Sequence, residues 1–213
     1  MKSRIIAAVW AVILFSFCSN RATAQDTLRF WDPAPEYIKS RGIIVGTSLG
    51  SAYVLSMTGL YSLWYKDYPT SSFHFFDDSD EWLQMDKAGH FGSAYYLGKW
   101  GMDLFRWTGM ERKKAILMGG SMGFVFLTTI EVFDGFSEEW GFSVGDMIAN
   151  TAGTAMAISH EMIWDEQRIK VKFSFHQSDY EQYRPDQLGD NFIENVFKDY
   201  NGQTYWLSGN VKS

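Results

Sequence analysis

The chain has 213 residues, of which 46% are hydrophobic and 21% charged, and its mean hydropathy is -0.19. These values are typical of one globular domain and argue against both an intrinsically disordered chain and a polytopic transporter. The formal net charge of -6 excludes functions that need a basic face to neutralise phosphates, so we expect no nucleic-acid partner.

The N-terminus predicts an export signal. Lys2 and Arg4 precede an apolar run over residues 5–17, and a small-residue A-x-A site ends at Ala24. This order of charge, short apolar core and small residues is typical of a cleaved secretory signal peptide. We therefore expect residues 1–24 to be a signal peptide, cleaved after Ala24, and the protein to be exported.

Cys18 offers lipid attachment as a second way of anchoring the chain. Phe17 argues against it, because a lipoprotein signal has a small residue before its cysteine. Cleavage after Ala24 would leave no cysteine, which excludes disulfides and thiol catalysis. The sequence leaves open whether the inner or the outer membrane is involved.

The first predicted helix lies in residues 42–65, a stretch of 24 residues without a charge. As a helix it would be about 36 Å long, enough to cross the roughly 30 Å hydrocarbon core of a bilayer. Gly42, Gly46 and Gly50 recur at every fourth position, a pattern that lets two helices approach closely. A transmembrane helix and the core helix of a soluble bundle both remain open.

A loop rich in aromatic and acidic residues follows over 66–85, and a second, amphipathic helix is predicted over 86–106. Within this helix Lys99 and Asp103 are four residues apart, which predicts an ion pair on one polar face.

A third helix is predicted to begin at Arg112, with an uncharged stretch over 115–130, and a fourth to occupy residues 143–164. Both carry small residues at every fourth position, a spacing that favours close helix packing. These residues are Gly119 and Gly123 in the third helix and Gly145, Ala149, Gly153 and Ala157 in the fourth. The pattern predicts a helical core domain over residues 25–165.

The pattern changes in the C-terminal tail, residues 166–213. Apolar and polar residues alternate over 169–175, which predicts a half-exposed strand, and we expect the rest of the tail to be irregular or briefly helical. The predicted fold is mainly α: a four-helix membrane-associated bundle with a short strand-containing C-terminal tail.

Polar residues at same-face spacing stand at the ends of three of these helices. In an up-and-down bundle, the start of the second helix, the end of the third and the start of the fourth share one end. We therefore expect one polar cluster, formed by Asp86, Lys87, His90, Glu131, Asp134, Ser143, Asp146 and Asn150. Ser143 is also the expected N-cap of the fourth helix, with Asp146 completing a capping box.

The ordered motifs in this region resemble a known family. Asp86-Lys87-x-x-His90-Phe91, Glu131-x-x-Asp134 and Ser143-x-x-Asp146 followed by Asn150 and Gly153 resemble the YfiM-like predicted periplasmic lipoproteins. More distantly, they are similar to the VanZ-like membrane proteins. The resemblance covers residues 86–160 and implies a helical fold and an envelope location, but no reaction.

Three interpretations of the cluster remain open. It is a buried network that fixes helix packing, a divalent metal site for Mg, Mn or Zn, or a site that hydrolyses an envelope lipid or glycan. The metal ligands would be His90, Glu131, Asp134 and Asp146. A hydrolase would use these ligands with a metal, or Glu131 or Asp146 as base and His90 as acid without one.

We favour a structural or interaction role over an enzyme, because the usual His-x-x-x-His and Glu-x-x-His spacings and a nucleophile elbow are missing. The expected partners are membrane or envelope components. Protein partner, substrate and oligomeric state stay open. Basic residues between the second and third helices place that turn in the cytoplasm by the positive-inside rule, which conflicts with a cleaved signal and leaves the topology open.

Overall fold

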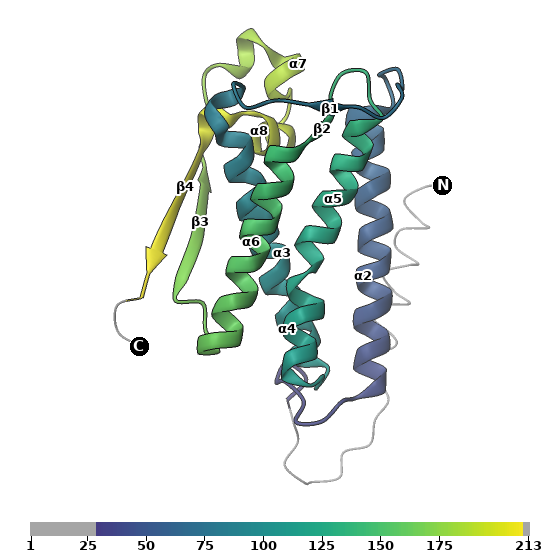
Figure 1. Ribbon diagram of the computed structural model, residues 1–213, viewed down its shortest axis with the longest axis vertical. Coiled ribbons are helices and arrows are strands. Elements are labelled where there is room, and N and C mark those ends of the chain that lie inside the picture. Colours follow the sequence, from purple (N-terminus) through teal and green to yellow (C-terminus); the bar gives the residue numbers. More distant parts are fainter. Residues whose placement is uncertain (1–28, 211–213) are drawn as a thin grey trace. The chain divides into compact units, whose positions relative to one another are not determined.

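The computed structural model describes residues 29–210, so the predicted signal peptide and Cys18 lie outside the described residues. The chain forms two compact units, residues 1–32 and 33–213. In the first unit, the described residues form a turn in which the rings of Phe30 and Trp31 meet edge to face. The second unit is mainly helical and contains the features that follow (Figure 1).

The four predicted helices are confirmed, with one division. Three are continuous: α2 over Lys39–Leu60, extended by a π-helical turn over Tyr61–Tyr65; α3 over Met85–Trp107; and α6 over Val144–Trp164. The third predicted helix is divided into α4 over Arg112–Gly120 and α5 over Met122–Gly135. The division follows two successive glycines, whose low helix propensity makes a break inexpensive at this point.

Glycines let the backbones of α3, α5 and α6 come close together. A Cβ atom added to Gly123 would lie 2.4 Å from the carbonyl oxygen of Ala94, and one added to Gly153 would lie 2.2 Å from that of Phe91. Separations this short leave no room for a side chain. The predicted close packing through small residues is confirmed for these helices.

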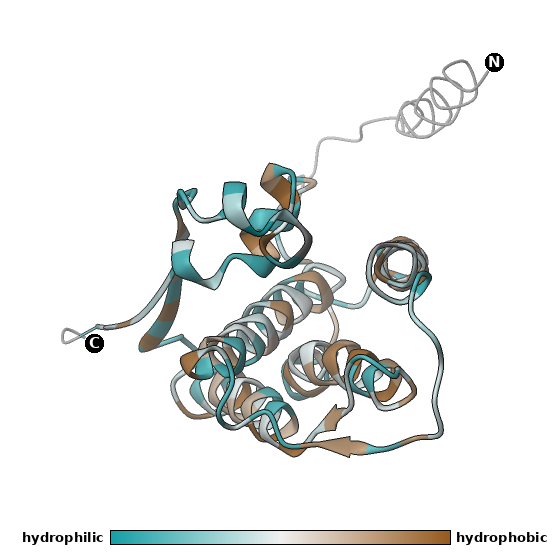
Figure 2. Ribbon diagram, turned by 90° about the horizontal axis from the view of Figure 1, so that it is seen from above, coloured by the Kyte–Doolittle hydropathy of each residue, from teal (hydrophilic) through white to brown (hydrophobic). Residues whose placement is uncertain are grey.

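The glycine stripe of α2 behaves differently. A Cβ atom added to Gly46 or Gly50 would have no heavy atom within 4 Å. The interpretation of this stripe as a contact with another helix of the bundle is therefore wrong, because α2 lies at the edge of the bundle with these glycines turned outward (Figures 1 and 2).

Two small sheets complete the unit. In the expected loop over 66–85, β1 (Phe75–Phe76) pairs in parallel with β2 (Phe142–Ser143), so this segment is tied to the start of α6. The predicted strand in the tail is confirmed as β3 (Ile169–Phe175). It pairs antiparallel with β4 (Gln203–Gly209), which was expected to be irregular.

The tail is part of the packed core. Val171 of β3 is buried with Tyr95, Met102, Ile116 and Ala157. The hydroxyl of Tyr96 also donates a hydrogen bond to the carbonyl oxygen of Val171 at 2.5 Å. Between β3 and β4 the tail forms two short helices, α7 over Pro185–Leu188 and α8 over Phe192–Lys198. Burial of a strand residue joins the tail to the helices.

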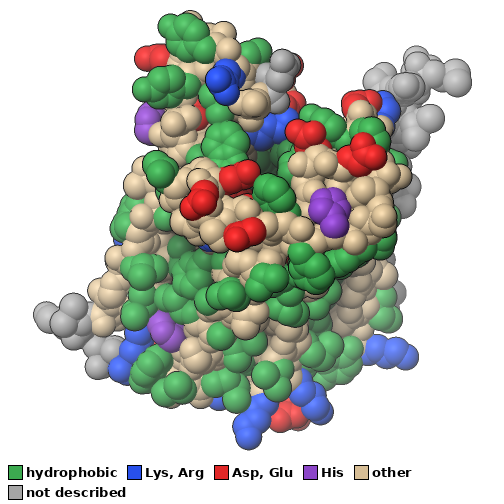
Figure 3. Space-filling view, turned by 45° about the horizontal axis from the view of Figure 1, so that its top comes forward, with side chains coloured by type: hydrophobic (Ala, Val, Ile, Leu, Met, Phe, Trp, Pro, Cys, Tyr) green, Lys and Arg blue, Asp and Glu red, His purple; other side chains and the backbone are tan. Residues whose placement is uncertain are grey.

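Two helical stretches, Lys39–Leu60 and Arg112–Gly135, are long and apolar enough to cross a membrane by length and composition, a test that a buried core helix or a signal sequence also passes. In their most apolar windows, 11% and 33% of the residues are buried. Figure 3 shows hydrophobic side chains gathered across the middle of the visible face, acidic side chains above them and Lys and Arg side chains at the lower end.

Candidate functional site

The polar cluster forms at one end of the bundle, where α3 and α6 begin and α5 ends (Figure 1). Asp86 and His90 lie one turn apart at the start of α3. Glu131 lies in the last turns of α5, and Asp146 and Asn150 lie at the start of α6. The expected convergence of the three helix ends is present in the structure.

His90 is at the centre of the cluster. Its Nε2 atom lies 3.9 Å from Oδ1 of Asp86 and 3.6 Å from Oε1 of Glu131. Its Nδ1 atom lies 3.1 Å from Oδ1 of Asn150. An amide oxygen can only accept a hydrogen bond, so Nδ1 donates to Asn150 and Nε2 is the ring nitrogen that faces the carboxylates.

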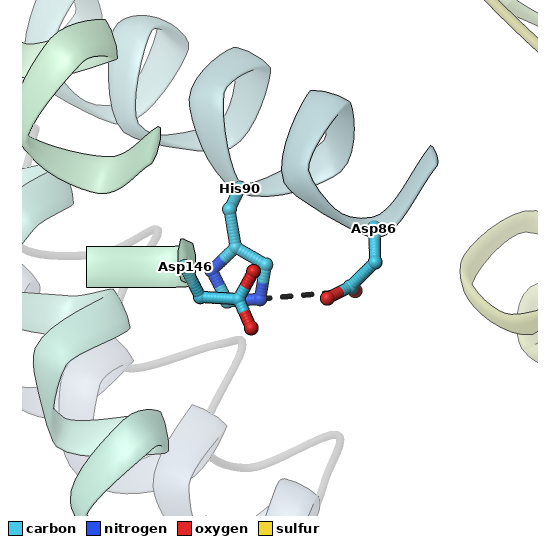
Figure 4. Close-up of side chains that lie close together, drawn as sticks. All are labelled: Asp86, His90 and Asp146. Carbon is cyan, nitrogen blue, oxygen red and sulfur yellow. Dashed lines mark ion pairs between the residues drawn. The ribbon is translucent and has the colours of Figure 1, made fainter. Parts of the chain in front are cut away.

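Asp86, His90 and Asp146 form a compact set of metal-ligand types. One ligand atom from each of the three side chains lies within 4.8 Å of the other two. Figure 4 shows the three side chains close together, with the His90 ring pointing towards Asp86 and overlapping the Asp146 carboxyl group in this view. Asp146 is 4% exposed, so water has little access to this side of the set.

Several buried polar atoms of the cluster have no hydrogen-bond partner within the described part of the chain. They are Oε1 of Glu131, Oδ1 of Asp146 and Nδ2 of Asn150. Glu131 is 1% exposed and Asn150 is 0% exposed. Buried polar atoms without partners cost free energy, so these atoms mark a place where a bound group would be stabilised.

Lys87 contributes an ammonium group to the cluster. It pairs with Asp78, and its Nζ atom lies 3.1 Å from Oδ1 of Asp146 and 3.5 Å from Oδ2 of Asp86. The contact with Asp146 is an ion pair without hydrogen-bond geometry. One ammonium group is thus shared by several carboxylates, which leaves negative charge in excess.

Ser143 is the N-cap of α6, as predicted. Its Oγ atom accepts a hydrogen bond from the backbone N–H of Asp146 at 3.1 Å. The predicted capping box is incomplete, because the backbone N–H of Ser143 donates to Oε2 of Glu131 at 3.1 Å instead. Glu131 of α5 is therefore the acceptor in place of Asp146.

Asp134 lies apart from the compact set. It accepts a hydrogen bond of 2.5 Å from the hydroxyl of Tyr65, which lies in the π-helical turn after α2. Of the four expected metal ligands, His90, Glu131 and Asp146 face the centre of the cluster, and Asp86 is there in place of Asp134.

Three residues near the cluster were missed from the sequence as members of the site. Tyr65 binds Asp134, Asp78 accepts a 2.9 Å hydrogen bond from the Ser143 hydroxyl, and Tyr200 donates one of 2.7 Å to Oδ1 of Asp86. Asp78 was visible in an acidic segment, but the pairing of β1 with β2 that places it has no local signal. Tyr65 and Tyr200 reach the cluster from distant segments with no motif to indicate it.

The surroundings shift the pKa values of the acidic groups. Burial, followed by the charge of Asp146, raises the pKa of Glu131 to about 9. Burial also raises the pKa of Asp146 to about 7, with Asp86 adding to the rise and His90 and Lys87 opposing it. Burial raises the pKa of Asp134 to about 6 against the hydrogen bond from Tyr65. The common cause is the removal of carboxylates from water.

The pKa values of the two groups at the edge of the cluster shift so as to favour their charged forms: that of Asp78 is lowered and that of Lys87 is raised. Burial alone would raise the pKa of Asp78, but hydrogen bonds from Lys87 and Ser143 hold it below its usual value. Burial alone would lower the pKa of Lys87, but Asp78 and Asp146 raise it. These shifts indicate that Lys87 and Asp78 are charged at neutral pH.

Two cavities lie elsewhere in the described part of the molecule. One, of about 470 Å³, is lined by residues of the tail between His176 and Asn201. The other, of about 200 Å³, is mainly apolar and is lined by aromatic residues that include Tyr65 and Phe133. Neither of these cavities is lined by Asp86, His90 or Asp146.

Comparison with known proteins finds that part of the chain is similar to a described family. Residues 74–161 match the model of the family described as predicted periplasmic lipoprotein (DUF2279). The match supports a periplasmic lipoprotein-like domain and a bacterial envelope location. It includes the whole polar cluster apart from Tyr65 and Tyr200. No curated protein and no solved structure is significantly similar to the chain.

Proposed function

We propose that this chain is a membrane-associated protein of the bacterial envelope with a structural or interaction role, and that its polar cluster binds a divalent cation. The similarity to predicted periplasmic lipoproteins supports the location. The resemblance to the YfiM-like proteins, and more distantly to VanZ-like membrane proteins, belongs to the same proposal.

One observation carries the cation site. Oε1 of Glu131 is buried, has no hydrogen-bond donor among the described residues, and faces Nε2 of His90 at 3.6 Å. With Nδ1 engaged by Asn150, Nε2 and Oε1 are left to share either a proton or a cation between them. A divalent ion would take both atoms as ligands.

The available donors suit a borderline or hard divalent ion. Carboxylate oxygens favour Mg²⁺ and Mn²⁺, whereas an imidazole nitrogen favours Zn²⁺ and later transition metals. Asn150 would act as the group that orients His90, a common arrangement around metal-bound histidines. Because the ligands come from α3, α5 and α6, the ion would join three helices, which fits a structural role.

Titration with Mn²⁺ tests the site. We expect the purified wild-type chain to bind one Mn²⁺ saturably, measured as loss of the free Mn²⁺ signal in electron paramagnetic resonance. Asp86→Asn should weaken binding at least about tenfold, because a ligand charge is lost. Asp103→Asn is the matched control, since Asp103 lies on the same helix in an exposed ion pair with Lys99, and it should bind like the wild type.

Lys87→Met separates a cation site from a purely structural network. It removes the ammonium group that competes for Asp146 and should destabilise the cation-free protein by about 3 kcal/mol, because buried carboxylates lose their counterion. We expect Mn²⁺ to bind more tightly to this variant and to restore its stability. Equal destabilisation with and without Mn²⁺, or no saturable binding of Mn²⁺, Zn²⁺ or Mg²⁺ by the folded wild type, contradicts the proposal.

The hydrolase considered from the sequence has no specific observation in its favour. A hydrolase needs room for a substrate beside the reacting groups, and the two cavities described above are lined by other residues. The proposal is therefore limited to binding.

A further inference from the structure

We propose that the outward face of α2 is the contact of this protein with lipid, and that it lies in the hydrocarbon layer of a bilayer. This inference rests on the envelope location proposed above and is independent of the cation site. Its basis is the surface of α2 itself.

The outward face of α2 is apolar and open. Leu55 is 72% exposed, and Ile43, Ile44 and Val54 are also exposed. Of the 22 residues of α2, only Arg41, Val45 and Met57 are buried. A large contiguous apolar surface is unusual in a soluble monomer and marks a contact with lipid or with another protein.

Three hydroxyl groups of this segment are bonded back to their own helix. The hydroxyl of Thr47 donates to the carbonyl oxygen of Ile43 at 2.8 Å, that of Thr58 to Val54 at 2.8 Å, and that of Ser62 to Thr58 at 2.9 Å. In hydrocarbon each hydrogen-bonding group must find its partner within the protein. Hydroxyls bonded back to their own helix meet this condition.

Charged side chains are confined to the ends of this segment. No charge occurs between Gly42 and Tyr65, whereas exposed Lys39 precedes the segment and exposed Lys66 follows it. Exposed Tyr61 and Tyr68 lie near the second end. Lysine and tyrosine at the ends of an apolar helix are typical of the membrane–water interface.

The far side of the same unit differs from α2 in charge, although it also exposes apolar side chains such as Trp206 and Leu207. β3 and β4 lie on the side of the bundle away from α2 (Figures 1 and 2). There Lys170 and Lys172 are exposed on β3. Lysines in mid-strand require water. The strand side therefore carries charge in mid-element, whereas α2 carries none between Gly42 and Leu60.

Lipid explains the α2 face better than a second copy of the chain. Gly46 and Gly50 form a small-residue stripe, but the neighbouring exposed side chains, such as Leu55, Val54 and Ile44, are large and flexible or β-branched. The exposed lysines at the two ends of the segment, with tyrosines near the second end, match the interfaces of a bilayer and are not needed for contact with a second copy. We therefore commit to lipid, and a second copy is an outcome of the test.

The test uses two single-cysteine variants of the full chain in a Cys18→Ser background, Leu55→Cys on α2 and Leu207→Cys on β4. Leu207 is 61% exposed, so it is a matched exposed leucine on the other face. Each variant is labelled with a fluorophore and reconstituted in phosphatidylethanolamine–phosphatidylglycerol vesicles. Both substituted side chains are exposed, so we expect both variants to fold, as checked by circular dichroism.

We expect brominated acyl chains to quench most of the emission from position 55 and aqueous iodide to quench little of it. Position 207 should show the reverse. Iodide quenching at position 55 equal to that at position 207 overturns the inference. Protection of position 55 from both quenchers, with energy transfer between labelled copies, also overturns it and assigns the face to a second copy. Loss of Mn²⁺ binding would leave these results unchanged, so the two proposals fail separately.

Discussion

At the scale of single residues, Ser143 combines a helix cap that its local sequence predicts with contacts to residues far away in the chain. Its hydroxyl caps α6 and donates to Asp78, while its backbone N–H binds Glu131. The cap was predictable because it depends on residues three positions apart. The two other contacts come from segments that only the fold brings to this place.

We predict that Ser143→Ala lowers the free energy of unfolding by about 2 kcal/mol, because the cap and the hydrogen bond to Asp78 are lost together. Urea unfolding followed by circular dichroism measures the change. Ser159→Ala is the control in the same helix. Its hydroxyl bonds to the carbonyl oxygen of Met156 within the helix, so a change below about 0.5 kcal/mol is expected. Equal effects of the two substitutions would refute the role of Ser143.

Backbone conformation next to the cluster had no sequence signal. Trp82, Leu83 and Gln84 all have positive φ angles, between 48° and 63°. This region is unfavourable for residues with a side chain by roughly 1–2 kcal/mol each. The segment joins the loop that carries Asp78 to the start of α3, so the path of the chain is set by its two attached ends. Propensity alone would have placed a different turn there.

At the scale of elements, the same glycine spacing leads to two outcomes. Gly123 lies against the backbone of α3, whereas Gly46 faces outward. Periodicity identified both stripes, because the spacing is a property of the helix alone. Which stripe is buried depends on which helices are neighbours in space, and no local sequence pattern specifies those neighbours.

We predict opposite effects for alanine at the two positions. Gly123→Ala should destabilise the protein by about 1–3 kcal/mol, because its Cβ would overlap the carbonyl of Ala94. Gly46→Ala should be neutral or stabilise α2 by up to about 1 kcal/mol through helix propensity. Thermal unfolding in detergent measures both. Destabilisation by Gly46→Ala comparable to that by Gly123→Ala would show that α2 packs against a partner at this stripe.

At the scale of the whole molecule, the tail completes the cluster. Val171 is buried in the core, and Tyr200 donates to Asp86. The alternation that predicted β3 was clear, but the paired residues of β3 and β4 are 28 to 40 positions apart, and Tyr200 is 114 positions from Asp86. The tail therefore contributes a hydrogen-bond donor to the site, although its sequence predicts a mostly irregular segment outside the core.

We predict that Tyr200→Phe lowers the free energy of unfolding by about 1–3 kcal/mol, because a partly buried carboxylate loses a donor. It should also weaken Mn²⁺ binding if Tyr200 orients Asp86. The control is Tyr183→Phe, at a tyrosine of the tail that is 75% exposed. Urea unfolding and Mn²⁺ titration give the two readouts. An unchanged free energy of unfolding would show that the hydrogen bond from Tyr200 to Asp86 does not stabilise the protein.

The sequence by itself determined where the helices and β3 lie, which helix ends carry polar residues, and that these ends meet. Each of these depends on short-range spacing or on simple up-and-down connectivity. The tertiary structure alone decided that Asp78 and Tyr200 contact the cluster, that Asp134 lies apart from the compact set and accepts a hydrogen bond from Tyr65, and that α2 turns its apolar face outward. These outcomes depend on packing between distant segments, and side chains that meet only through packing leave no periodic signal along the chain.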